Sequence, residues 1–201
     1  MDKFDVGIIF NVVLIILEII GLIICYNALG SIDLTYYTID SNIFLLISSL
    51  LYLIARKNIL RIVHLAKYSS TVSVVITFSV VILILLPMND FNYEFFFFFG
   101  PNLYMHVLCP IIALISFIFF EKNDVENTLK NNLRAMYFTI IYAIILISLN
   151  IIGLVSGPYH FLKVTEQSVF MSIFWLLLIL GFAFILSRVI LMARELYNIL
   201  N

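Results

Sequence analysis

The sequence is dominated by long apolar runs, and they limit the possible folds more than any other feature. A helix needs about 20 mostly apolar residues to cross the hydrocarbon core of a bilayer. Six runs reach that length, at about 7–27, 37–55, 68–87, 101–120, 135–155 and 169–193. Hydrophobic residues make up 64% of the chain and charged residues 11%, whereas soluble domains carry about 25% charged residues. We therefore expect an integral membrane protein.

The runs predict helices and not barrel strands. Barrel strands alternate apolar and polar residues over about 10 positions, and these runs do not alternate. The connections between them are short, so we expect an all-α polytopic membrane protein in which residues 1–201 form a single transmembrane domain, a six-transmembrane-helix bundle. The first run exceeds the apolar core of a signal peptide and follows an acidic stretch, so we interpret it as a retained span.

The basic residues predict the orientation of this bundle. Cytoplasmic connections of membrane proteins are enriched in Lys and Arg. With six spans, all Lys and Arg residues but Lys163 fall on one side of the membrane: Lys3, Arg56, Lys57, Arg61, Lys67, Lys122, Lys130, Arg134, Arg188 and Arg194. Both termini are therefore expected to be cytoplasmic, and the segments 28–36, 88–100 and 156–168 to lie outside.

Polar residues gather in the outer half of the predicted bundle. The stretch "YYTIDSNIFLL" at 36–46 places Thr38, Asp40 and Asn42 where the second span begins, more polar groups than one helix terminus needs for capping. Polar groups in membrane helices usually face the bundle interior or a watery cavity. This distribution predicts a binding site with the candidate residues Thr38, Asp40, Asn42, Asn102, His106, Asn150 and His160.

Three features of the spans have more than one interpretation. Pro110 lacks an N–H, so the carbonyl of His106 loses its helical partner and a kink is expected, either purely structural or exposing His106 to a cavity. Glu18 lies in the middle of the first span and should be protonated or paired. The run Phe95–Phe99 is either a lid at the outer interface or part of an aromatic belt.

Several kinds of site find no support in the sequence. The net charge of −1 argues against nucleic acid as a partner. Cys25 and Cys109 lie within apolar runs and form no metal-binding motif, and phosphate loops and the common hydrolase motifs are missing. We therefore expect no cofactor and no metal. A row of buried acids and bases, typical of proton-driven pumps, is also not expected.

Three short motifs resemble a known family. "YYTIDSN" in the second span, "NLYMHVLCP" in the fourth and "GPYHFLKV" before the sixth look like bacterial six-helix proteins of the Pr-six-Pr type. Those are similar to the androgen-induced protein family, which includes the androgen-dependent TFPI-regulating protein. The resemblance implies an intramembrane hydrolase of fatty-acid esters in which Thr38 matches the nucleophile and His106 the histidine. It also implies a multi-pass protein of the bacterial cytoplasmic membrane.

The chemistry of these residue types is compatible with that implication. A Thr hydroxyl needs a base to become a nucleophile, and an imidazole titrates near neutral pH. Asp40 or Asn102 could orient the imidazole, and Asn42 or Asn150 could donate to an oxyanion. Two alternatives stay open: a non-catalytic lipid- or solute-binding protein, and an acyl transferase with Cys109 as nucleophile. The sequence leaves the substrate and the oligomeric state open.

Overall fold

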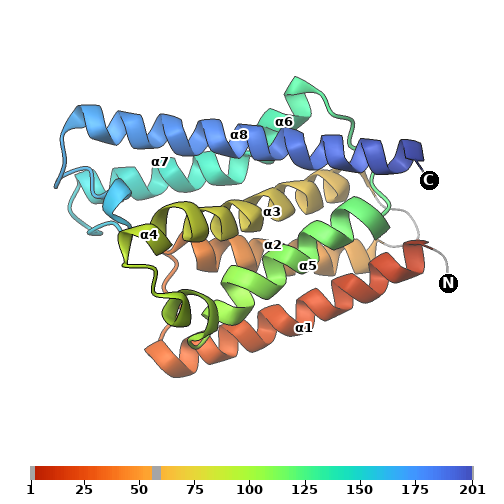
Figure 1. Ribbon diagram of the computed structural model, residues 1–201, viewed down its shortest axis with the longest axis horizontal. Helices are drawn as coiled ribbons and strands as arrows, with labels where there is room; N and C mark the ends of the chain where they lie inside the picture. Colours follow the sequence, from red (N-terminus) through yellow and green to blue (C-terminus); the bar gives the residue numbers. More distant parts are fainter. Residues whose placement is uncertain (1–2, 56–59, 201) are drawn as a thin grey trace.

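The structure, a computed structural model, describes residues 3–55 and 60–200, and every regular element in these ranges is helical. Long helices lie side by side in a bundle (Figure 1). Their bounds are α1 Lys3–Leu29, α2 Tyr37–Ile54, α3 Arg61–Val80, α4 Leu86–Met88, α5 Cys109–Ile115, α6 Leu129–Ala135, α7 Tyr137–Ile151 and α8 Val169–Leu200. Wider π-helical turns extend them at η1 Val81–Leu85, η2 Glu94–Phe98, η3 Leu103–Leu108 and η4 Ser116–Phe120, and η5 His160–Leu162 is a 3-10 turn.

The predicted all-helical membrane class is confirmed. Five continuous helical segments in the described ranges are long and apolar enough to cross a membrane: Asp5–Leu29, Tyr37–Ile54, Arg61–Met88, Leu103–Phe120 and Val169–Leu200. The helices α6 and α7 meet at an angle of 44° and supply a sixth crossing if the pair is counted as one span. The fifth predicted run, 135–155, is thus shorter and bent, because α7 ends at Ile151.

The two ends of the bundle hold different connections. The helix α1 begins and α8 ends at the same end, here called the terminal end, and the connection between η4 and α6 also lies there (Figure 1). The connections 30–36, 89–102 and 152–168 lie at the opposite, distal end. Of the basic residues on which the predicted orientation rests, Arg56 and Lys57 lie outside the described residues.

Helix α3 lies at the centre of the bundle. It contacts α2, α5, α6, α7 and α8, and its residues are buried without a break from 67 to 77. Many of them carry hydroxyl groups, which need partners because lipid offers none. Ser70 pairs with Ser48 at 2.6 Å and Thr77 with Ser41 at 3.0 Å, so hydroxyl pairs connect α3 to α2 along its length.

Three charged side chains toward the terminal end are buried. Lys67, which the sequence places in a connection, lies within α3 and is fully shielded. Glu121 is 3% exposed and Arg194 is 7% exposed. The Arg194 guanidinium donates to the carbonyl of Phe117 and, at 2.5 Å, to that of Glu121. The sequence placed these three residues just outside the predicted spans, but neighbouring helices cover them. The expectation that the chain lacks a row of buried acids and bases typical of proton-driven pumps stays a prediction.

Candidate functional site

The structure brings Thr38 and His106 together at the distal end. Thr38 lies in the first turn of α2 and His106 in η3, and the distance from Thr38 Oγ1 to His106 Nε2 is 3.5 Å. This is the outer limit of a hydrogen bond, and catalytic contacts in unliganded sites are often this long. The two residues are 68 positions apart in the chain, so the fold itself creates the pair.

The hydrogen bond at the second ring nitrogen of His106 determines which nitrogen carries the proton. His106 Nδ1 lies 2.8 Å from the backbone carbonyl of Phe96, which can only accept. In a neutral imidazole one nitrogen donates and the other accepts, so Nδ1 carries the hydrogen. The lone pair of Nε2 therefore faces the Thr38 hydroxyl, the arrangement that a general base requires.

The run Phe95–Phe99 holds this carbonyl in place. Turn η2 folds back against η3, and Asn102 Nδ2 donates to the carbonyl of Phe95 at 2.8 Å. Phe96 is buried with its ring against His106, whereas Phe98 and Phe99 are 66% and 61% exposed. The segment thus covers His106 and turns other rings outward.

The backbone before Pro110 departs from a regular α-helix, as expected because proline cannot donate a hydrogen bond to the carbonyl of His106. The chain widens into the π-helical turn η3 before α5, in which Pro110 occupies the first turn. Such turns often occur at functional sites because they redirect side chains. Asn42 then joins the two backbones, since its Nδ2 donates to the carbonyls of Thr38 at 2.7 Å and Met105 at 3.2 Å.

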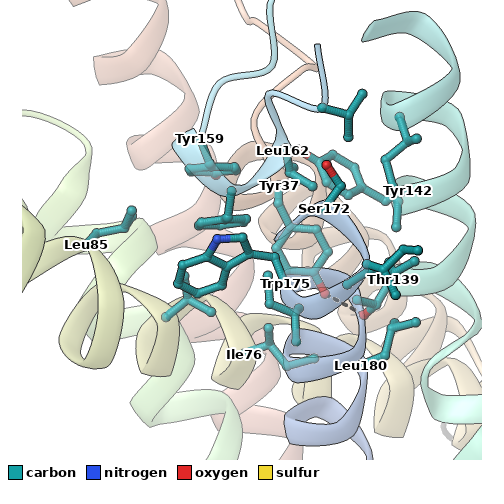
Figure 2. A pocket seen from close by; sticks show the side chains of 18 of the residues that line it. Tyr37, Ile76, Leu85, Thr139, Tyr142, Tyr159, Leu162, Ser172, Trp175 and Leu180 are labelled. Atoms are coloured by element: carbon teal, nitrogen blue, oxygen red, sulfur yellow. Dashed lines mark hydrogen bonds between the residues drawn. The ribbon is translucent and has the colours of Figure 1, made fainter. Parts of the chain in front are cut away.

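Thr38 lies in the wall of an apolar cavity. The cavity has a volume of about 420 Å³ and lies between α2, α3, α7, α8 and the connection that contains η5. Figure 2 shows the aromatic side chains that line it, among them Tyr37, Tyr159 and Trp175. The Tyr37 hydroxyl is bonded to Thr139 at 2.7 Å and is thus satisfied. Such a space suits an acyl chain with its polar group at Thr38.

Tyr159 adds a hydroxyl beside Thr38. It interacts with the side chain and the backbone of Thr38, and burial raises its pKa to about 12, while the interaction with the Thr38 side chain acts in the opposite direction. The phenol therefore keeps its proton at neutral pH and can donate a hydrogen bond within the cavity that Thr38 also lines. The ring is held by stacking on Phe161 at 5.1 Å and by an edge contact with Tyr36 at 6.1 Å.

Of the candidate residues only Thr38 lies in this cavity lining; His106 contacts Thr38 from outside it. The Asp40 side chain is partly buried and makes no hydrogen bond to the residues that the structure describes, whereas its backbone N–H donates to the Tyr36 carbonyl at 3.2 Å. Asn150 Nδ2 donates to Val155 at 2.9 Å, and His160 is exposed on η5. Cys109 is fully buried away from the cavity, which leaves an acyl transferase based on it without access to a substrate.

Two sequence-based assignments differ from the structure. The imidazole was expected to be oriented by Asp40 or Asn102, but a backbone carbonyl does so; Asn102 acts one step away, through Phe95. Sequence reasoning also selected His160 from the motif "GPYHFLKV", whereas Tyr159 is the residue directed to the site. In the structure, Tyr159 and not the neighbouring His160 lines the cavity.

Comparisons with known proteins add no relative: no family model matches the chain, and no match was found among the curated proteins or the solved structures. The function is therefore inferred from the geometry of the chain's own residues.

Proposed function

We propose that the protein is an intramembrane hydrolase of lipid esters, with Thr38 as nucleophile and His106 as general base. One observation carries the proposal: the Thr38 hydroxyl faces the unprotonated nitrogen of His106 at 3.5 Å and also lines the apolar cavity. Two residues from different helices thus meet, and one of them, Thr38, lines a space that fits a lipid chain. The resemblance of the short motifs to the androgen-induced protein family agrees with this assignment.

The reaction would proceed in two halves. His106 Nε2 takes the proton of Thr38 Oγ1 while this oxygen attacks the ester carbonyl carbon. The Tyr159 hydroxyl, on a residue that lines the same cavity as Thr38, would donate to the oxyanion that forms. The bond to the alcohol oxygen then breaks, and the alcohol leaves with the proton from His106. Water, deprotonated by His106, hydrolyses the acyl-threonine and restores both residues.

The orientation in the membrane forms part of the proposal. Counting α6 and α7 as one span gives six crossings and places both termini on the side richer in Lys and Arg, the cytoplasmic side. The dyad then lies in the outer leaflet of a bacterial cytoplasmic membrane, with membrane lipid as partner and a fatty-acid ester as substrate. Cysteine scanning of 153–157 and 122–127 with a membrane-impermeant thiol reagent tests this: labelling from outside is expected only in the first segment.

The test of activity compares purified variants on a chromogenic long-chain fatty-acyl ester in detergent micelles. Thr38→Ala and His106→Ala should each lower kcat by at least about 100-fold, since general-base catalysis contributes about 10²- to 10⁴-fold. Thr38→Ser should retain measurable turnover. Thr165→Ala is the matched control, because Thr165 lines the same cavity but belongs to the connection between η5 and α8. Equal turnover in all variants would remove the proposal.

A second candidate is a non-catalytic lipid-binding protein. The cavity is apolar over almost its whole lining, and such a space holds an acyl chain without any chemistry. This alternative predicts that a fluorescent fatty acid binds to wild type and to Thr38→Ala equally and that neither hydrolyses an ester. Measurable ester turnover that is lost in Thr38→Ala would support the hydrolase and exclude the non-catalytic alternative.

A further inference from the structure

The apolar cavity opens sideways, between the end of α7 and the beginning of α8. Most of the residues that line it are buried or half-buried. The exposed ones belong to one stretch of the chain and are Ile151, Thr165, Val169 and Ile173. Ile151 is 65% exposed and Val169 is 76% exposed. The mouth of the cavity therefore lies where both helices turn apolar side chains outward, to the lipid.

Helix α8 is buried against the bundle only over its terminal half. Among the described residues of α8, none before Ala183 is buried, whereas Ala183 and Ser187 are fully shielded. This half contacts α3 and α6, but the backbones of α7 and α8 approach each other at few points. Figure 2 shows Tyr142 of α7 and Trp175 of α8 directed to the space that separates the two helices. The distal half of α8 thus lies over the cavity.

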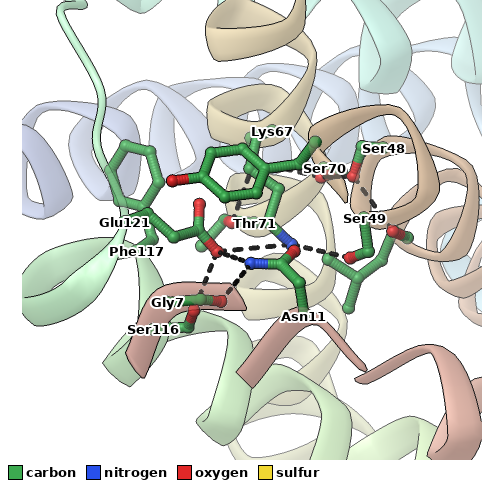
Figure 3. Close-up of polar contacts among 12 residues, drawn as sticks. Gly7, Asn11, Ser48, Ser49, Lys67, Ser70, Thr71, Ser116, Phe117 and Glu121 are labelled. Carbon is green, nitrogen blue, oxygen red and sulfur yellow. Dashed lines mark hydrogen bonds and ion pairs between the residues drawn. The ribbon is translucent and has the colours of Figure 1, made fainter. Parts of the chain in front are cut away.

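Buried polar side chains fill the bundle toward its terminal end. Figure 3 shows Glu121, which follows η4, in contact with α1 and α3. Its Oε1 accepts hydrogen bonds from Asn11 Nδ2 at 2.9 Å and from Ser116 Oγ at 2.8 Å, and lies 3.6 Å from Lys67 Nζ. The cavity lining on α3 ends before this cluster, at Ile76. A ligand would therefore enter through the mouth and not from the terminal end.

The cavity has the depth of one lipid leaflet. Its lining on α8 extends from Val169 to Leu180, which is about 16 Å at a rise of about 1.5 Å per residue. The hydrocarbon core of a bilayer is about 30 Å thick, so the acyl chains of one leaflet span about 15 Å. Thr38 lines the cavity from the first turn of α2, at the distal end. An acyl chain can thus move sideways into the cavity while it stays parallel to its neighbours.

We propose that the acyl chain of a bilayer lipid enters the cavity sideways, between the end of α7 and the beginning of α8, with its ester group at the level of Thr38. In naming a substrate, this rests on the hydrolase proposed above. The substrate is then a lipid of the surrounding leaflet whose ester group lies at the head of its acyl chain. The apolar side chains at the mouth admit the chain, and a charged headgroup stays at the interface because its burial in an apolar space is unfavourable.

Photo-crosslinking in liposomes tests this entry in Thr38→Ala, which keeps the lipid intact whether or not the wild type is a hydrolase. The probe is phosphatidylcholine with a diazirine at the end of one acyl chain, mixed into phosphatidylcholine liposomes that contain the full chain. Ile76 and Thr77 line the cavity but are 2% and 3% exposed, so lipid outside the bundle does not reach them. Peptide mass spectrometry should find an adduct on one of these two residues of α3. Adducts confined to outward-facing residues would overturn the proposal.

Variants at the mouth then test the route, in the same Thr38→Ala background. Ile173→Trp fills the mouth and should abolish the adduct on α3, whereas Ile173→Ala widens it and should keep the adduct. Leu178→Trp is the matched control, because Leu178 is exposed on α8 but does not line the cavity. Helix content and a single gel-filtration peak establish folding of each variant. An adduct on α3 that persists in Ile173→Trp would overturn entry between α7 and α8.

Turnover of a long-chain ester in liposomes, measured with Thr38 present, separates this proposal from the hydrolase itself. Loss of turnover in Ile173→Trp but not in Leu178→Trp would support both. If no variant hydrolyses the ester while the adduct on α3 still depends on the mouth, the hydrolase is wrong and the sideways entry of lipid stands. Turnover that is unchanged in Ile173→Trp would overturn the sideways entry and leave the hydrolase in place.

Discussion

Replacing Tyr159 by Phe tests the proposed role of its hydroxyl with little disturbance of the site. The substitution removes one oxygen and keeps the ring that stacks on Phe161 and touches Tyr36. If the hydroxyl stabilises the oxyanion, its loss costs about 2.7–4 kcal/mol, which is about 10²- to 10³-fold in kcat. If it only binds Thr38 in the resting enzyme, the cost is about 1 kcal/mol, roughly fivefold.

The assay is kcat on the saturating chromogenic ester, with Tyr142→Phe as control. Tyr142 lines the same cavity, but its hydroxyl donates to the backbone of Thr35 at 2.6 Å, so this variant should stay near wild type. Because the pKa of Tyr159 is raised to about 12, its proton is retained, and the ratio of wild-type to Tyr159→Phe activity should be constant from about pH 6 to pH 10. A kcat within about fivefold of wild type would refute the oxyanion role.

Three further predictions follow from neighbouring contacts. Asn102→Ala removes the hydrogen bond to Phe95 that steadies the segment over the histidine, and kcat should fall about fivefold at unchanged KM, the loss of about 1 kcal/mol; a change confined to KM would contradict this. Ala143→Phe narrows the cavity and should raise KM about tenfold for long-chain esters but not for acetyl esters, because excluding about two methylene groups costs about 1.6 kcal/mol; equal effects on both esters would argue against an acyl site. The hydrogen bond from His64 lowers the pKa of Asp124, so Asp124→Asn should lower the free energy of unfolding at pH 7 by less than about 1 kcal/mol for this exposed carboxyl, measured as a lower melting temperature. The difference should vanish as the pH falls through the lowered pKa of Asp124, and a difference that persists in acid would exclude this hydrogen bond as its cause.

The apolar runs were sufficient to predict the helices, because a chain in lipid must satisfy its backbone hydrogen bonds within each helix. The segment Tyr37–Ile54 matches the predicted 37–55 closely. The predicted helix boundaries were wrong where tertiary contacts determine the end of a helix. Helix α3 begins at Arg61, well before the predicted 68, since Lys67 finds an ion partner inside the bundle and need not reach water.

The dyad could be predicted, but its surroundings could not. Thr38 and His106 belong to the polar residues that stand out in the apolar runs, and the resemblance of the short motifs to a known family singled out this pair. The carbonyl of Phe96 that orients the imidazole carries no sequence signal, because every residue has one. Tyr159 lies in the motif "GPYHFLKV" beside the selected His160, and only the folded connection brings it to the cavity that Thr38 lines.

The central claim is that Thr38 is a nucleophile activated by His106, and covalent labelling measures it most directly. A fluorophosphonate incubated with the full chain in detergent should form an adduct that peptide mass spectrometry assigns to Thr38. The adduct should be absent in Thr38→Ala and strongly reduced in His106→Ala, while Thr165→Ala should label as wild type does. An adduct on another residue, or labelling of Thr38 that is unchanged without His106, would contradict the account.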